Sequence, residues 1–272
     1  MLRRGRSGFV MPYKKLSIDV KNRVGYILMG SGQRFNKLSV TMLKELKRAV
    51  AELCQHPEVV CMVITGYPGE SFAVGADISQ MAEFGPVDGF SFAELGQSLF
   101  DAIESCPKPV IGALNGITMG GGCDLALSCD LRVASDALLI AHPGAKLGII
   151  TGFCGTQKLP RLVRRNFARE IFMTSASYGA ADALRMGLID RFCPADEFWE
   201  RVVSLAERIA AASPAALAMA KKAINTSEDC DLKTGCALEA ASYAYLFATS
   251  AERERMTDFL EGTKNVFGTE NT

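Results

Sequence analysis

Gly120-Gly-Gly-Cys-Asp124 stands between one apolar run, residues 110–114, and a second, residues 125–127. Consecutive glycines leave backbone N–H groups with no side chains in front of them, and at the N-terminus of a helix such unpaired amides carry partial positive charge. Amides of this kind suit a carbonyl oxygen that becomes anionic during a reaction. The stretch therefore predicts a strand, a tight turn and a helix, with Asp124 as the nearest side chain for acid–base chemistry.

A second segment, Ser71-Phe-Ala-Val-Gly-Ala-Asp-Ile78, has a similar pattern. It follows another apolar run, residues 59–65, and it presents small residues before a predicted helix. Two loops that each offer an unobstructed amide can together hold one oxygen atom. Taken alone, the glycine triplet could be only a tight turn where two stretches of backbone approach closely, and the second segment favours the functional interpretation.

The composition is that of an ordinary globular protein with a sizeable core. The chain has 272 residues, of which 49% are hydrophobic, and its 30 basic and 30 acidic residues cancel. The net charge gives no reason to expect DNA, RNA or an anionic membrane as a partner. Nine cysteines without a Cys-x-x-Cys pair, and only two histidines, predict neither a disulfide framework nor a metal site. Reduced thiols and the lack of a spanning segment favour a cytoplasmic location, or the mitochondrial matrix in a eukaryote.

Apolar periodicity divides the chain into three parts. Residues 1–15 are basic and predict a flexible arm, and residues 16–195 alternate strands with helices, which predicts an α/β core with right-handed crossovers. Residues 196–272 show only helical patterns, and we expect them to pack on the core and on other subunits. The expected strands are 16–20, 24–29, 59–65, 110–114, 131–134 and 138–141. The expected helices are 41–54, 92–104, 197–212, 215–226, 232–248 and 251–261, and 70–81 is expected to be a loop turning into a helix.

Several segments in one order resemble the enoyl-CoA hydratase/isomerase (crotonase) family, and the likeness runs from about residue 17 to residue 267. They are Phe72-Ala-Val-Gly-Ala-Asp-Ile78, Lys108-Pro-Val-Ile-Gly-Ala-Leu-Asn-Gly116, Gly120-Gly-Gly-Cys-Asp-Leu-Ala126 with Cys129-Asp130, Gly155-Thr-Gln-Lys-Leu-Pro-Arg161 and Ala180-Ala-Asp-Ala-Leu-Arg-Met-Gly-Leu188. The resemblance implies a crotonase-like (ClpP/crotonase) spiral of β-β-α units with a helical C-terminal trimerisation region. It also implies an acyl-CoA thioester as substrate, no tightly bound cofactor, and a homotrimer or a hexamer built as a dimer of trimers.

The same resemblance assigns roles to particular residues. It implies that the N–H groups of Ala76 and Gly121 form an oxyanion hole. It implies that the adenine and pantetheine of coenzyme A lie along residues 73–78, with Ala73, Ala76, Asp77 and Ile78 in contact. Arg34 and Lys264 are candidates for the phosphates.

This chain departs from the family at the catalytic carboxylates. The first of two glutamates maps onto Asp124, which is shorter by one methylene, and the second maps onto Gly144, which has no side chain. Water addition by the two-carboxylate route is therefore in doubt. His142, two residues before Gly144, can exchange protons at neutral pH because an ordinary imidazole titrates near pH ~6.5. The alternatives are an Asp124 that only complements the helix dipole and a His142 that is only structural.

Three functions stay open at this point. One is enoyl-CoA hydration or isomerisation, as in fatty acid metabolism, with an isomerisation needing a single carboxylate. Another is decarboxylation, in which the oxyanion hole stabilises the enolate left by carbon dioxide. The third is a non-catalytic paralogue that binds acyl-CoA or RNA. The local basic stretch with Arg161, Arg164, Arg165 and Arg169 predicts a solvated helical face, and we do not expect RNA as a partner.

Overall fold

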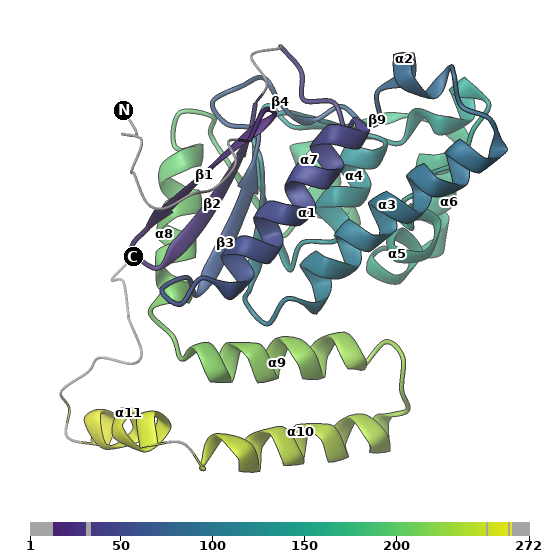
Figure 1. Ribbon diagram of the computed structural model, residues 1–272. Helices are drawn as coiled ribbons and strands as arrows, with labels where there is room; N and C mark the ends of the chain where they lie inside the picture. The colour runs from purple at the N-terminus through teal and green to yellow at the C-terminus, as the bar shows by residue number, and fades with distance from the viewer. Residues whose placement is uncertain (1–12, 31–33, 249, 261, 263–272) are drawn as a thin grey trace. The chain divides into compact units, whose positions relative to one another are not determined.

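The computed structural model describes residues 13–30, 34–248, 250–260 and 262. The chain divides into two compact units, Met1–Ala211 and Ala212–Thr272. Figure 1 shows two sheets and most of the helices in the first unit, and helices alone in the second.

A six-stranded sheet forms the centre of the first unit, in the order β1-β2-β3-β5-β7-β10. Its strands are β1 (Leu16–Lys21), β2 (Val24–Met29), β3 (Cys61–Thr65), β5 (Val110–Leu114), β7 (Leu131–Ser135) and β10 (Arg191–Cys193). Only the β1–β2 pair is antiparallel. β3 and β5 are buried along their whole length, which explains why they read as continuous apolar runs in the sequence.

A second, four-stranded sheet has the order β4-β6-β8-β9. Its strands are β4 (Ser71–Ala73), β6 (Ile117–Met119), β8 (Leu139–Ala141) and β9 (Ser177–Gly179). The sequence-based expectation for residues 70–81 was wrong in one respect, because β4 precedes the loop and the short helix α2 (Ile78–Met81). β4 has only three residues, which gives too little alternation for a pattern to mark it, although β8, of the same length, was expected at 138–141.

The chain visits the two sheets in turn, which produces the expected spiral of β-β-α units. β3 lies in the first sheet, β4 in the second, and a helix follows; β5, β6 and the next helix repeat this path. The remaining helices of the first unit are α1 (Val40–Gln55), α3 (Pro86–Ser105), α4 (Gly121–Leu127), η1 (Pro143–Leu147), α5 (Gly155–Leu162), α6 (Arg165–Thr174), α7 (Ala180–Met186) and α8 (Phe198–Ala210). This repeated path brings the loops after β4 and β6 to the same edge of the second sheet.

Two helices cover the start of the spiral. α1 and α3 lie side by side (Figure 1), and α1 buries Met42, Leu43 and Leu46 on one face at helical spacing. α3 begins at Pro86 and not at residue 92, because Asp88 accepts a hydrogen bond of 2.9 Å from the amide of Gly85 and caps the first turn. Residues 86–91 are exposed, so this turn has no apolar pattern in the sequence.

The second unit consists of α9 (Pro214–Thr226), α10 (Leu232–Leu246) and α11 (Ser250–Leu260). These helices agree with the expected ones to within two residues at each end. Ser213 and Asp231 cap α9 and α10 by accepting hydrogen bonds of 3.1 Å from the amides of Ala216 and Thr234. Across the described ranges no single helix is long and apolar enough to cross a membrane, and only α8 and α9 taken together reach that length and composition.

Candidate active site

The loops that follow β4 and β6 are in van der Waals contact. A methyl group placed on Gly75 would lie 3.0 Å from the carbonyl oxygen of Met119 and 3.5 Å from the amide nitrogen of Gly121. A methyl group on Gly122 would overlap the carbonyl oxygen of Ala73 and lie 2.7 Å from its carbonyl carbon. Gly75 also has a φ of +90°, a conformation that residues with a side chain rarely adopt. Glycine is therefore needed at both positions for the two loops to meet.

The backbone amides of Ala76 and Gly121 are among those on these loops that have no protein acceptor in the described part of the chain. Gly121 is the first residue of α4, and the first amides of a helix have no partner within the helix. The carbonyl of Gly75 is engaged by the amide of Leu38 at 2.8 Å, which fixes the backbone just before Ala76. The two amides are thus held by rigid neighbours on facing loops, and the helix dipole favours negative charge near Gly121.

Asp124 is completely buried in the first turn of α4. Its Oδ2 accepts a hydrogen bond from the hydroxyl of Thr151, and the Nε2 of His142 lies 3.3 Å from each carboxylate oxygen. Its Oδ1 has no hydrogen-bond partner in the described part of the chain and lies against Gly155, where a methyl group would overlap it. A buried carboxylate oxygen without a hydrogen bond is costly, and the Nε2 of His142 at 3.3 Å offsets part of that cost.

His142 is also buried, with only 3% of its surface exposed. Its ring lies 4.6 Å from the ring of Phe172, and its second nitrogen, Nδ1, has no partner among the residues that the structure describes. A methyl group on Gly144 would lie 3.8 Å from this Nδ1. The ring therefore faces Asp124 with one nitrogen and the side-chain-free position of Gly144 with the other.

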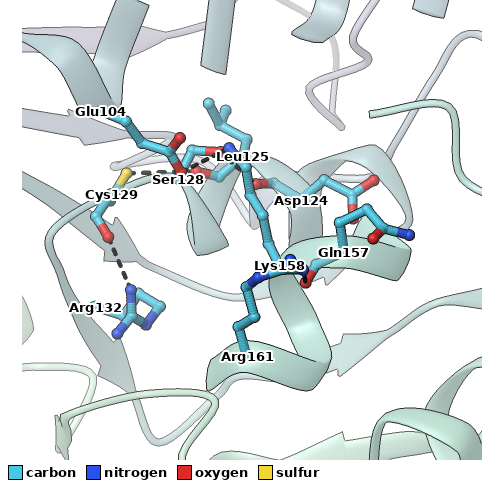
Figure 2. A network of polar contacts seen from close by, with 9 residues as sticks. All are labelled: Glu104, Asp124, Leu125, Ser128, Cys129, Arg132, Gln157, Lys158 and Arg161. Atoms are coloured by element: carbon cyan, nitrogen blue, oxygen red, sulfur yellow. Dashed lines mark hydrogen bonds and ion pairs between the residues drawn. The ribbon is translucent and has the colours of Figure 1, made fainter. Parts of the chain in front are cut away.

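A network of polar contacts joins α5 to α4 (Figure 2). Lys158 pairs with Glu104 at 2.6 Å and donates to the hydroxyl of Ser128 at 3.0 Å, and Ser128 in turn donates to the carbonyl of Asp124 at 3.0 Å. This network holds α5, and with it Gly155, against the helix that carries Asp124. Lys158 has a structural role here because its ammonium group is already engaged.

The thiols near the site are not nucleophiles. Cys123 is fully buried beside Asp124, and burial raises the pKa of its thiol well above its ordinary value. Burial also raises the pKa of Cys154. Both thiols stay protonated at neutral pH, and a thiol reacts as its thiolate.

A cavity of 420 Å³ opens beside His142 and Thr151. Its wall is formed by η1, the segment after it, α5 and one face of α6. The lining residues are His142, Gly144, Ala145, Ile149, Ile150, Thr151, Thr156, Pro160, Arg165, Ala168, Arg169, Phe172 and Met173. They include two arginines and a histidine but no carboxylate, so the cavity suits an acyl group rather than a cation.

The candidate contacts for coenzyme A are more scattered. Arg34 forms an exposed ion pair of 2.9 Å with Glu70, and Asp77 pairs with Lys37 at 3.2 Å. Ile78 is 48% exposed, whereas the side chain of Ala73 is completely buried in β4. Ala73 is therefore not accessible to a ligand in this structure, and its predicted contact with coenzyme A has no support here. Lys264 lies outside the described residues.

Sequence reasoning brought together Ala76, Gly121, Asp124 and His142 but missed Thr151 and Gly155. Thr151 is 27 positions from Asp124 in the sequence, and no local pattern marks its hydroxyl as a partner of that carboxylate. Gly155 opens one of the segments that resemble the family, but nothing in that segment shows that its lack of a side chain makes room for the carboxylate. The tertiary fold alone reveals both roles.

The spiral of β-β-α units is the crotonase fold, and solved structures of that class superimpose closely on this one. The model of the family described as enoyl-CoA hydratase/isomerase matches residues 19–270. The chain belongs to the enoyl-CoA hydratase/isomerase family.

The similarity to individual members extends over nearly the whole chain. The short-chain-enoyl-CoA hydratase of Clostridium acetobutylicum is 34% identical over 93% of this chain and 97% of its own length. The crotonyl-CoA hydratase of Syntrophomonas wolfei is 35% identical over 94% of this chain and 99% of its own. The crystal structure of an enoyl-CoA hydratase from Bacillus anthracis has a TM-score of 0.88 at 30% identity, and covers 91% of this chain and 96% of its own.

Proposed function

We propose that this protein is an enzyme that binds an enoyl-CoA thioester and hydrates or isomerises it through a thioester enolate. The observation that carries the proposal is the pair of unpaired amides, Ala76 and Gly121, on two loops in contact. An enolate places its negative charge on the former carbonyl oxygen, and donors aimed at such an oxygen each contribute about 10²- to 10³-fold to the rate. The relatives named above are hydratases of enoyl-CoA or crotonyl-CoA, which agrees with this substrate class.

Asp124 and His142 are the proposed proton-handling groups. An isomerisation returns to one carbon the proton removed from another, so Asp124 alone balances the reaction. A hydration adds hydroxide at one carbon and a proton at the next, so it needs a base for the water and an acid for the carbon. His142 provides the second group, because its Nδ1 faces the position of Gly144, where this chain lacks a second carboxylate.

The test is to measure hydration of crotonyl-CoA and isomerisation of a β,γ-unsaturated acyl-CoA by the wild type, Asp124→Asn and His142→Gln. We expect Asp124→Asn to lose both activities, because the amide cannot accept a proton, and His142→Gln to lose hydration far more than isomerisation. Activity retained by Asp124→Asn would remove the carboxylate from the mechanism. Thioester binding without any turnover would instead indicate the non-catalytic paralogue that binds acyl-CoA or RNA.

Decarboxylation is a second candidate, favoured by a cavity without a lining carboxylate, since an acid there would repel a carboxylated acyl group. In that reaction the carbon–carbon bond breaks, carbon dioxide leaves, and the electron pair forms the enolate that the two amides stabilise. A proton then adds to the carbon. Release of carbon dioxide from methylmalonyl-CoA, with no hydration of crotonyl-CoA, would select this candidate.

Coenzyme A is proposed to lie along the loop after β4. Asp77 and Ile78 are accessible there, and Arg34 lies on the preceding segment. Because Arg34 is exposed and already paired with Glu70, we assign it a contribution of about 1 kcal/mol or less to the binding of the phosphates. Arg34→Ala is therefore expected to raise KM less than tenfold without changing kcat.

The assembly is proposed to be a homotrimer or a dimer of trimers that buries apolar side chains of the second unit. Large apolar residues of this unit are exposed: Ile224, Leu232, Tyr243, Tyr245, Phe247, Met256, Phe259 and Leu260. Exposed apolar patches of this kind mark interfaces. Light scattering of the full chain should give three or six times the mass of one chain, and a monomer at micromolar concentration would contradict the proposal.

A further inference from the structure

One face of α6 forms a basic wall of the cavity. Arg165, Ala168, Arg169 and Phe172 follow helical spacing and all line it. The two arginines stand one turn apart, so both guanidinium groups border the same space. Both are exposed to solvent, so a ligand that enters the cavity can reach them.

The positive charge of this wall is uncompensated in the described structure. Neither Arg165 nor Arg169 forms an ion pair with a described carboxylate. α6 has no acidic residue in its first turn, and the residue before it is Arg164, which makes no side-chain cap. Cations at a helix N-terminus oppose the helix dipole, whereas an anion is stabilised there. The arginines near the N-terminus of α6 therefore lower the stability of this helix, and they favour the binding of a negatively charged ligand.

A buried polar atom in the same cavity also points to a ligand. Nδ1 of His142 has no partner among the described residues, and this histidine, only 3% exposed, lines the cavity. His142 and Thr151 each contact Asp124 as well as the cavity. The cavity therefore lies beside the residues proposed for proton transfer. Proton transfer takes place on the acyl group, so the cavity is placed to hold the acyl group and not the nucleotide.

We propose that the cavity takes an acyl group that ends in a carboxylate, and that Arg165 and Arg169 bind this carboxylate. The inference rests on the proposed function, because it names the acyl group of the same thioester. Arginine suits the role because its planar fork of N–H donors matches the two oxygens of a carboxylate. The phosphates of coenzyme A are the other source of an anion, and the experiment separates the two.

The experiment compares glutaryl-CoA with pentanoyl-CoA by calorimetric titration of the full-length protein. The two thioesters have acyl chains of equal length and differ at the far end, where one has a carboxylate and the other a methyl group. Both lack the double bond, so no turnover interferes. We expect the wild type to bind glutaryl-CoA about tenfold or more tightly than pentanoyl-CoA, because hydrogen bonds to a charged group are the stronger kind.

The variants are Arg165→Met and Arg169→Met, with Arg164→Met as the matched control. Arg164 carries the same charge one residue away and does not line the cavity. We expect Arg165→Met and Arg169→Met each to lower the affinity for glutaryl-CoA about tenfold and the affinity for pentanoyl-CoA less than twofold. Arg164→Met should change neither affinity.

Three results would overturn the inference. Equal affinities of the wild type for the two thioesters would show that the acyl carboxylate is not recognised. Equal weakening of both thioesters by the variants would assign the arginines to the phosphates of coenzyme A. Failure of the wild type to bind either thioester would overturn the proposed function itself, and the inference with it.

Discussion

Gly122→Ala tests the contact on which the proposed oxyanion hole depends. The new methyl group would lie 2.7 Å from the carbonyl carbon of Ala73 and 2.9 Å from its Cβ, and it would overlap the carbonyl oxygen. Real Cβ contacts are essentially never shorter than 3.0 Å, so α4 and β4 must separate. Two of the three clashing atoms belong to the backbone, so a side-chain rotation cannot relieve the overlap.

The expected loss follows from the size of that separation. A shift of roughly 0.5–1 Å between the loops misplaces the amide of Gly121 relative to that of Ala76, and misplacement on this scale costs about 10²-fold in rate. Loss of one oxyanion donor costs about 10²- to 10³-fold. We therefore expect kcat to fall about 100-fold. The overpacking should also lower the free energy of unfolding by about 1–3 kcal/mol.

The assay follows the ultraviolet absorbance of the conjugated thioester, with stability measured by denaturant unfolding. Gly89→Ala is the control, because Gly89 lies in α3 with no atom within 4 Å of the added methyl group. It should stabilise the protein by up to about 1 kcal/mol and leave kcat unchanged. A Gly122→Ala variant that folds and retains full activity would refute the assignment of these loops to the thioester oxygen.

Three further results are expected. Thr151→Val should lower kcat about tenfold, because Asp124 loses a hydrogen bond, and Thr151→Ser should restore it in steady-state assays. Gly155→Ala, which places a methyl group on the Oδ1 of Asp124, should reduce the free energy of unfolding by about 1–3 kcal/mol in denaturant titrations. Burial raises the pKa of Tyr26 from 10.0 to about 12, with a smaller contribution from Glu207. The folded protein therefore holds this proton between pH 10 and 12 after the unfolded chain has released it, so stability falls as the pH rises through that window, and less steeply in Tyr26→Phe. If the stability of the wild type and of Tyr26→Phe fell equally steeply between pH 10 and 12, the raised pKa of Tyr26 would be contradicted.

Long apolar patterns made most of the fold predictable. The runs that became β3 and β5 and the amphipathic stretch that became α1 are decided by burial over several consecutive residues. β4, β6, β9 and β10 were not predicted, because a strand of three residues depends on its neighbouring strands more than on its own pattern. β8 is equally short but was expected, since it lies in an apolar run. The boundaries of the predicted N-terminal arm (residues 1–15), core (residues 16–195) and helical C-terminal region (residues 196–272) stay predictions.

The accessible amides of the site were predictable from the sequence because glycine leaves the backbone uncovered there. Gly121 and Gly75 could be recognised because a run of small residues between apolar segments is typical of a turn with accessible amides. Thr151 could not be recognised, since its hydroxyl meets Asp124 only after the chain has passed through η1 and returned. The basic stretch before and within α6 was expected to be a solvated face, and Arg165 and Arg169 are indeed exposed, but they also line the cavity. Only the three-dimensional structure shows whether an exposed arginine lies on an open surface or lines a cavity.

The amides of Ala76 and Gly121 belong to the main chain, and this affects how the protein can change in evolution. Exchange of a side chain at these two positions does not delete either N–H, except through proline, which has none. Asp124, His142 and Gly144, by contrast, can each be altered by a single codon. Descendants of this fold can therefore keep the proposed binding of the thioester oxygen while the side chains proposed for proton transfer change.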